Sequence, residues 1–550
     1  MTRGRDAGWS VAIFVAVAAL YLVTSSREPA WGDARPMWEV ATQLVAEHRI
    51  DIGVRWPEDI PPGRGGKIYG IAPIGPALMQ VPGVVLAGVA HHRAPTLEGM
   101  LKPLCVHLGP ALLGALACVV LFGMLRDLGI RVRTASACAA ILACSTTTWV
   151  YARMPYSEIL QLVAFLGLFR HVLRVSALAE PAVAPDDGLA HAPATVRREG
   201  LWFGLWAGVL LDAKYVFAGA IVGAVVAILW AFRLSLRTSA GRQVLLRLAG
   251  WAAVTGGPLL ALALAYNYAR WGSVTATGYE PYLASYFGGS LFDGLWGMLL
   301  SPTKSAFLYS PPLVLAMIGL PAAVRAVPRL GVALLAMVVP IVLVYSTYRS
   351  WSGDYAWGPR FFVWAVPVLL VPLAWFIDRS ASRWRRAVLV AVVAGGIGVQ
   401  VLGSALYWDH FIRIAITAKN QWLGQPDRSG SYIPEKGRGH CDSCFEDTYE
   451  LLWTPPFSPI RGNYWLLKAM ARGDDWKSAQ VDAPWRGYTT LPIDLSQTYP
   501  RARIDWWVLL WALDLPATRT AGVSLLALML AALAAGVWRW LRLHRASPAS

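Results

Sequence analysis

The side chains best suited to chemistry in this sequence are charged residues that stand where long apolar runs end. The first is Asp33, which follows the first apolar run and precedes a stretch with helical periodicity. A carboxylate held at a membrane surface can take the proton of an acceptor hydroxyl, so Asp33 is our candidate general base. Asp is also a favoured N-cap residue, and with Pro36 close behind it this structural role fits the sequence equally well.

Basic residues stand at the corresponding ends of later apolar runs. A carboxylate that faces several cations suits a phosphorylated substrate and an acid–base step, because cations stabilise the negative charge of a phosphate. Each of these cations also suits the commoner role of a basic side chain that extends to the membrane interface. The candidates for phosphate binding are Lys67, Lys214, Arg270, Lys304 and Arg360.

Four further residues near the same ends are candidates for substrate binding: Arg35, Tyr69, Glu158 and Asp354. Glu158 also fits the first turn of a helix, where negative charge is favourable. Asp354 follows Gly353 and also fits a simple turn.

The cysteines divide into two groups. Cys441 and Cys444 lie in a polar segment after His440, where a local disulfide in an oxidising compartment is favoured over half of a metal site. Ligand spacing supports no metal site and no cofactor is predicted, although a divalent cation remains compatible with the acids. The other four cysteines fall in apolar runs and are expected to be buried filler: Cys105, Cys118, Cys138 and Cys144.

The chain that must position these residues is unusually apolar. Of its 550 residues, 56% are hydrophobic and 15% are charged, whereas a soluble chain carries about 25% charged residues. Repeated apolar runs of roughly 20 residues match the thickness of a bilayer core. The sequence therefore predicts an all-α polytopic membrane protein with about twelve transmembrane helices.

The positions of the basic residues predict how the chain is oriented. The formal net charge is +16, but the basic residues gather in short clusters between apolar runs, as in cytoplasmic turns. This distribution argues against nucleic acid as a partner. With the first run, residues 9 to 25, retained as a helix, both termini are expected in the cytoplasm of a bacterial-type inner membrane. The candidate site residues then share the external, periplasmic face.

Three parts are expected along the chain. Residues 1–406 form a transmembrane module whose first external loop spans 26–100. Residues 407–515 form an external, Pro-rich segment of mixed or irregular structure. Residues 516–550 hold the last transmembrane helix and a cytoplasmic tail.

Three local features are predicted within the transmembrane module. Residues 36 to 48 have the periodicity of an amphipathic helix that lies at the membrane interface. Residues 74 to 90 are assigned to a hairpin that lies on the membrane or is partly inserted. A further span here would place the basic clusters that follow it on the external side. Asp212 to Lys214 interrupt the apolar stretch 201–232, which predicts a tight external turn.

Several short motifs occur in a fixed order. They are G-K-x-Y-G-x-x-P-x-G-P from Gly66, P-Y-S-E ending at Glu158, N-Y-x-R-W-G-S from Asn267 and W-x-G-D-x-x-W-G-P-R ending at Arg360. Together with the acid after the first span, this order resembles the GT-C superfamily of integral-membrane glycosyltransferases. More narrowly, it is similar to the protein-mannosyltransferase and aminoarabinose-transferase branch. The resemblance covers roughly residues 9 to 406.

The resemblance implies a GT-C-like fold, a polyprenyl-phosphate-linked sugar donor and an active site on the external face. It also implies that an acid of the first loop is the general base, which places that role on Asp33. Many members have two adjacent acids at this point, whereas Ala34 follows Asp33 here.

The predicted function is therefore an inverting glycosyltransferase whose partners are membrane lipid, the lipid-linked donor and an acceptor glycan, lipid or protein. Asp33 deprotonates the acceptor hydroxyl, which attacks the anomeric carbon while the lipid phosphate leaves. Two other classes stay open. A lipid or sugar transporter or flippase also has about twelve spans and buried charges. An O-antigen ligase or polymerase shares the donor and places its acceptor chemistry on a late external loop, such as 408–515.

Overall fold

The computed structural model describes residues 2–26, 32–53, 60–93, 95–179, 193–353, 356–380, 382–422, 451–474, 483–484, 504–506 and 519–546. Within these ranges the protein is helical and has no strand, and only two isolated bridges join extended residues. Nine of the helices described are long and apolar enough to cross a bilayer, and four shorter apolar helices accompany them. The predicted all-α polytopic membrane architecture is confirmed.

The first half of the chain contains these elements: α1 (Thr2–Val23), α2 (Ala34–Glu47), η1 (Arg64–Gly66), α3 (Ile74–Arg93), α4 (Pro95–Asp127), α5 (Val132–Ser145), α6 (Thr148–Ala152), α7 (Glu158–Ala177), α8 (Pro193–Ala213), η2 (Tyr215–Phe217), α9 (Ala218–Phe232), η3 (Ser235–Arg237) and α10 (Ser239–Trp271).

The second half contains η4 (Glu280–Tyr282), α11 (Leu283–Tyr286), α12 (Leu291–Leu300), α13 (Ala306–Tyr309), α14 (Pro312–Ala326), α15 (Pro328–Ala333), the π-helical η5 (Leu334–Val338), α16 (Val339–Ser346), η6 (Arg360–Ala365), α17 (Val366–Leu370), α18 (Leu373–Asp378), α19 (Arg383–Ala405), α20 (Trp408–Trp422), η7 (Pro455–Phe457), α22 (Pro459–Arg472) and α24 (Arg519–Ala546).

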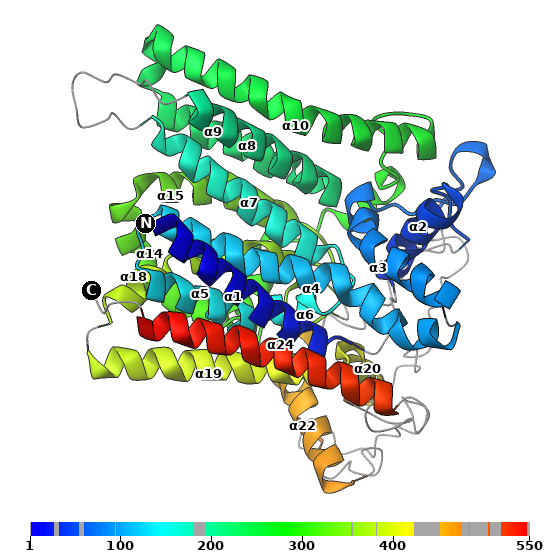
Figure 1. Cartoon of the computed structure of the whole chain (residues 1–550). Helices are drawn as coiled ribbons and strands as arrows, with labels where there is room; N and C mark the ends of the chain where they lie inside the picture. Colours follow the sequence, from blue (N-terminus) through cyan, green and yellow to red (C-terminus); the bar gives the residue numbers. More distant parts are fainter. Residues whose placement is uncertain are drawn as a thin grey trace.

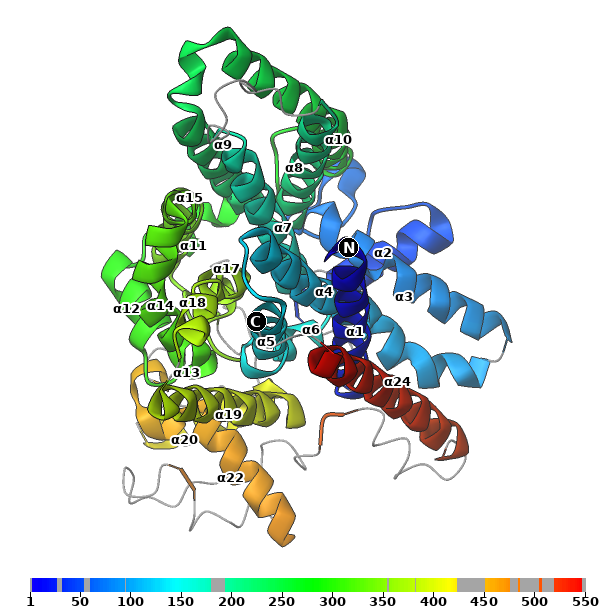
Figure 2. The same ribbon diagram turned by 60° about the vertical axis from the view of Figure 1, so that its left-hand side comes forward.

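The long helices run lengthwise through one bundle, and both chain termini lie at the same end of it, which we call the terminal end (Figure 1). Helix α2 lies at the opposite end, which we call the site end. Helices α1 and α24 pack side by side, and the view in Figure 2 agrees. The first and last helices are thus neighbours although most of the chain separates them.

Two local predictions for the site end are confirmed. Helix α2 is amphipathic and buries Met37, Val40 and Ala41. The break at Asp212 to Lys214 is a tight turn, because α8 ends at Ala213 and η2 begins at Tyr215.

The prediction of a hairpin within residues 74 to 90 is wrong. Residues 74–93 form one continuous helix, α3, which is itself long and apolar enough to cross a bilayer. It packs antiparallel on the first half of α4 through two glycines, because a Cβ at Gly83 would collide with Cys105 and one at Gly109 with Met79. The charge register constrains the number of crossings but not the shape of an extra apolar segment, so it could not reveal this helix pair.

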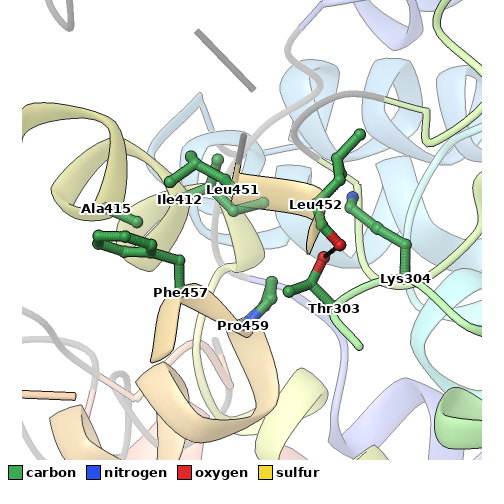
Figure 3. A pocket seen from close by; sticks show the side chains of 8 residues that line it. All are labelled: Thr303, Lys304, Ile412, Ala415, Leu451, Leu452, Phe457 and Pro459. Carbon is green, nitrogen blue, oxygen red and sulfur yellow. Dashed lines mark hydrogen bonds between the residues drawn. The ribbon is translucent and has the colours of Figure 1, made fainter. Parts of the chain in front are cut away.

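The segment after α19 is anchored to the bundle at separate points. Asp505 accepts hydrogen bonds from Arg153 and from Ser26, and all three side chains are buried. Thr303 Oγ1 donates to the Leu452 carbonyl at 2.9 Å, beside Lys304 (Figure 3). The described parts of this segment are mainly helical, whereas Cys441 and Cys444 lie outside the described residues.

The cysteines predicted to be buried are in the bundle. Cys105, Cys118 and Cys138 are buried and Cys144 is partly buried, and all four are free thiols. Their role as small apolar filler in the helices is confirmed.

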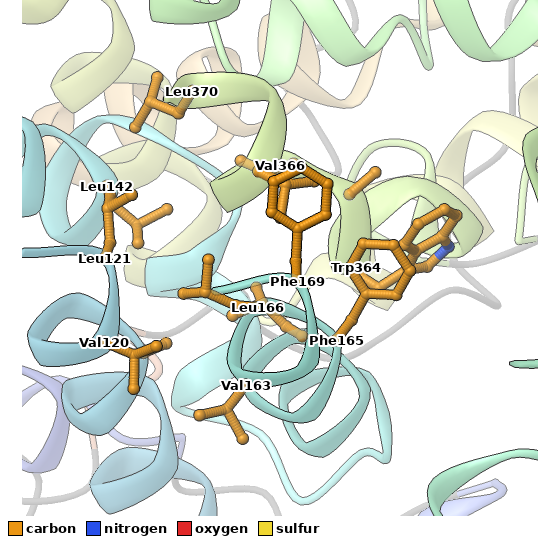
Figure 4. Close-up of a cluster of buried hydrophobic side chains, with 14 of the residues drawn as sticks. Val120, Leu121, Leu142, Val163, Phe165, Leu166, Phe169, Trp364, Val366 and Leu370 are labelled. Atoms are coloured by element: carbon orange, nitrogen blue, oxygen red, sulfur yellow. The ribbon is translucent and has the colours of Figure 1, made fainter. Parts of the chain in front are cut away.

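The core that supports the site end joins α4, α5, α7 and the η6–α17 segment (Figure 4). Trp364 of η6 is its central side chain, with its ring centroid 4.6 Å from that of Phe165 and 5.3 Å from that of Phe217. Its indole nitrogen donates to the Phe361 carbonyl at 2.7 Å. This packing fixes η6 against α7, and therefore fixes the residues at which the two elements begin.

We predict that Trp364→Ala destabilises the protein by about 3–5 kcal/mol, because it leaves a cavity between α7 and η6. The matched control is Trp384→Ala, since Trp384 is 76% exposed. Thermal unfolding of the purified protein in detergent measures both. Equal shifts for the two variants would contradict the role of Trp364 as the side chain that holds η6.

Candidate active site

Asp33 stands at the N-cap position of α2, but its side chain makes no capping hydrogen bond. Its Oδ2 instead accepts a hydrogen bond from an Arg360 terminal nitrogen at 2.8 Å. The Asp33 side chain is 47% exposed, so the carboxylate is open to a reactant while it is paired. The helix-capping interpretation of Asp33 is therefore not supported by a hydrogen bond in this structure.

Arg360 is the first residue of η6 and joins two acids. Its Nε donates to Glu158 Oε1 at 2.6 Å while its terminal nitrogen reaches Asp33. The guanidinium carbon lies 5.0 Å from the centre of the Tyr156 ring, within range of a cation–π interaction. One planar guanidinium thus holds two carboxylates and an aromatic ring in a fixed arrangement.

Glu158 begins α7 and is buried, with 2% of its side chain exposed. Ser157, just before it, accepts a hydrogen bond from Gln161 at 2.9 Å, which steadies the first turn. Glu158 Oε2 is buried and has no hydrogen-bond partner in the described structure. A buried carboxylate with one free oxygen can still accept a hydrogen bond from a bound molecule.

Lys214 adds a second cation to this cluster. Its ammonium lies 4.9 Å from the centre of the Phe361 ring and 5.6 Å from that of Tyr345. Burial lowers the pKa of Lys214, which the charges of Glu158 and Asp33 partly oppose and that of Arg360 reinforces. These mutual effects place Lys214 within electrostatic range of both acids and of Arg360.

A wall of aromatic rings that sequence reasoning missed continues from this cluster. Phe361 stacks on Tyr345 at 5.0 Å and meets the edge of Tyr348 at 5.0 Å. Tyr348 in turn contacts Tyr286 and Phe287, each at 5.4 Å. The residues come from three separate segments, η6, the end of α16 and the end of α11, so no spacing in the sequence could have shown that they adjoin.

Tyr279 is another residue that the sequence did not single out. Burial raises the pKa of its phenol, and the charge of Asp33 raises it further. Tyr279 is therefore a neutral phenol whose pKa responds to the charge of Asp33. Neighbouring Glu280 accepts from the Thr277 amide at 2.6 Å and the Gly278 amide at 2.8 Å, so it is occupied within its own loop.

Two of the predicted phosphate ligands are buried and bonded to backbone carbonyls. Arg270 donates to the carbonyls of Gly70 and Ala72 at 2.5 and 3.1 Å. Lys304 donates to the Ala356 carbonyl at 2.5 Å. Both cations support the loops around the site in this structure.

The remaining predicted residues lie as follows. Lys67 is half-exposed and pairs with Asp51 at 3.1 Å. Tyr69 is buried and donates to the Arg64 carbonyl at 3.3 Å. Arg35 is exposed, and Asp354 lies outside the described residues. Within the described residues, no group of three or more His, Cys, Asp or Glu side chains could hold a metal ion.

Two described residues before Arg360, Gly353 and Trp357, are closely packed. Trp357 is fully buried, with its ring 5.0 Å from that of Tyr309, and its carbonyl accepts from Tyr151 at 3.1 Å. Gly353 has a φ of 73°, and a Cβ there would collide with the Cβ of Arg360. These two residues therefore set the position of Arg360 from one side, while the packing of Trp364 sets it from the other.

Together, these features define a multi-pass helical membrane protein with two acids, two cations and an aromatic wall gathered at one end. No protein-family model matches the sequence, and no curated protein matches it. Among solved structures, the chain is similar to ArnT from Cupriavidus metallidurans bound to undecaprenyl phosphate. The identity is 16%, the TM-score is 0.46, and the match covers 76% of this chain and 70% of that one.

The chain is also similar to the archaeal oligosaccharyltransferase AglB from Archaeoglobus fulgidus in complex with an inhibitory peptide and a dolichol-phosphate. Here the identity is 14%, the TM-score is 0.47, and the match covers 82% of this chain and 60% of that one. Both TM-scores lie below 0.5, so these two likenesses carry no argument about function.

We predict that Gly353→Ala displaces Arg360 and destabilises the protein more than Gly65→Ala does. Both glycines have positive φ, at 73° and 70°, so both changes carry backbone strain of about 1–2 kcal/mol. Only at Gly353 does the new methyl group also meet a neighbouring side chain, since nothing lies within 4 Å of a Cβ at Gly65. Unfolding temperatures in detergent compare the two variants, and a larger loss for Gly65→Ala would contradict the prediction.

Proposed function

We propose that this protein is an inverting glycosyltransferase that moves a sugar from a polyprenyl-phosphate-linked donor to an acceptor hydroxyl. The observation that carries the proposal is the contact of half-exposed Asp33 with Arg360, in electrostatic range of Lys214. A carboxylate beside two cations can accept a proton while the cations hold the phosphate that leaves. The GT-C resemblance of the sequence supports the same donor class.

The proposed reaction proceeds in one displacement. Asp33 accepts the proton of the acceptor hydroxyl, whose oxygen forms a bond to the anomeric carbon of the donor. The bond between that carbon and the phosphate oxygen breaks, and its electron pair leaves with the polyprenyl phosphate. Arg360 and Lys214 stabilise the negative charge that grows on the phosphate.

Arg360 has two tasks in this proposal. In the structure it pairs with both Asp33 and Glu158. When a donor phosphate draws on the same guanidinium, the hold of Arg360 on Asp33 weakens and Asp33 becomes a stronger base. The free Oε2 of Glu158 is then an acceptor for a hydroxyl of the bound sugar.

The proposed orientation places the site end outside the membrane and both termini in the cytoplasm. Basic residues of the predicted cytoplasmic turns support it, because several of them gather at the terminal end. Arg126 pairs with Asp6 of α1 at 3.3 Å, and Arg133 donates to the His544 carbonyl of α24 at 3.2 Å. Such clustering is typical of the cytoplasmic side.

We predict that Asp33→Asn lowers turnover by about 10²–10⁴-fold, because the amide cannot accept the proton. The change is isosteric and half-exposed, so expression and unfolding temperature should stay near those of the unaltered protein. The assay measures release of polyprenyl phosphate from a panel of polyprenyl-phosphate sugars. Glu47→Gln, at the exposed far end of the same helix, is the matched control and should keep full activity. Full activity of Asp33→Asn with its natural donor would overturn the assignment.

We also predict that donor binding weakens as the pH rises. The weakening should begin at a lower pH than it would if an exposed lysine held the phosphate. Phosphate binding needs the charged ammonium of Lys214, and burial lowers the pKa of this group below its usual value. Raising the pH through that lowered pKa removes the charge, so the donor KM should rise at a pH where an exposed lysine still keeps its charge. Lys214→Arg keeps its charge and should show a flat KM over the same range. An identical rise in both proteins would exclude Lys214 as the titrating group.

A further inference from the structure

Helix α22 carries a basic face that the transfer reaction does not use. Arg461, Lys468 and Arg472 are exposed, and their spacing places them on one side of the helix. Exposed Tyr464, at 60%, lies among them. The 14 residues of α22 include no acid, and the first acid after them is Asp474, beyond the C-cap at Gly473.

The opposite face of α22 is already used for packing. Trp465, Leu466 and Ala469 are buried in a hydrophobic cluster with α20. Gly462 lies so close to Phe411 of α20 that a Cβ there would collide with the ring. The helix is therefore seated firmly on the protein, and its basic face is turned away from it.

The depth of α22 along the bundle follows from its contact with α19. Asn463 Nδ2 donates to the carbonyl of Leu402, which lies in the last turn of α19, a helix long and apolar enough to cross a bilayer. Figures 1 and 2 show α22 leading away from the bundle beyond α19 and α20. This level is where the hydrocarbon core gives way to lipid headgroups.

Neither Arg461 nor Lys468 forms an ion pair within the described residues, so their charges are available to an external anion. Basic side chains and a tyrosine at this level are the residues that anionic lipid headgroups attract. A soluble anion could bind at any height on the protein. It would therefore not explain why these residues lie level with the end of α19.

We propose that the exposed face of α22 binds the headgroups of anionic phospholipids and anchors the segment after α19 to the membrane surface. Arg461 and Lys468 each contribute an interaction with a lipid phosphate, and Tyr464 lies between them at the interface. This role is independent of the proposed sugar transfer, because it involves no residue of the candidate active site.

The test uses the full-length protein in detergent, with native mass spectrometry during titration with phosphatidylglycerol and, separately, phosphatidylcholine. We expect R461Q/K468Q to bind its tightest phosphatidylglycerol about 30-fold more weakly, from roughly 1 kcal/mol per basic residue near a lipid surface. Binding of phosphatidylcholine should be unchanged. Because both side chains are exposed, the variant should fold normally, which its unfolding temperature checks.

The matched control is R383Q/R385Q, which removes two exposed charges from the start of α19, at its other end. If α22 is the lipid site, this control keeps the tightest phosphatidylglycerol site, and R461K, which preserves both positive charges, retains it as well. Equal loss in the control and in R461Q/K468Q would overturn the proposal, since it would reflect net charge alone. So would unaltered phosphatidylglycerol binding combined with lost binding of an anionic oligosaccharide, which would assign the face to a soluble glycan.

Discussion

The bridge that Arg360 forms between Asp33 and Glu158 is the interaction on which the site end depends. A carboxylate as buried as Glu158 is costly unless an opposite charge and hydrogen bonds accompany it. Arg360 supplies both, although 202 positions separate it from Glu158 in the sequence. The same guanidinium also contacts half-exposed Asp33. Because Arg360 must lie beside buried Glu158, it also fixes the position of Asp33, the proposed base. Structural and chemical roles are therefore inseparable at this residue.

A second constraint explains why several cations at the site end are buried. The chain is irregular where its helices end, and the backbone carbonyls of such breaks that are buried in the protein need a hydrogen-bond donor. Arg270 satisfies the carbonyls of Gly70 and Ala72, Lys304 that of Ala356, and Arg153 that of Thr24 at 2.5 Å. These long basic side chains thus donate hydrogen bonds to backbone carbonyls that the helices leave unpaired around the site. Arg360 differs from them, because its guanidinium pairs with both Glu158 and half-exposed Asp33.

Sequence reasoning predicted most helices and the position of Asp33 at the end of the first one. It could not separate the cations that support loops from those that face the acids, because every one of them stands at the end of an apolar run. It also missed the aromatic wall from Phe361 to Tyr286, whose rings adjoin only when η6, α16 and α11 pack together. The hairpin expected at 74 to 90 was wrong for a related reason. Periodicity and charge register describe single segments, whereas Gly83 and Gly109 matter only once α3 meets α4.

The sequence by itself determined that this protein lies in a bilayer, because runs of apolar residues long enough to cross hydrocarbon have no other stable solvent. It also determined which charged residues stand at helix ends, since a charge within such a run is costly. Only the tertiary structure decided which of these charges meet. Trp364 packs on Phe165 and the backbone at Gly353 lies close against Arg360, whose guanidinium pairs with Glu158 and Asp33. Residues so far apart in the chain meet only because the helices pack together, and no local sequence pattern shows how they pack.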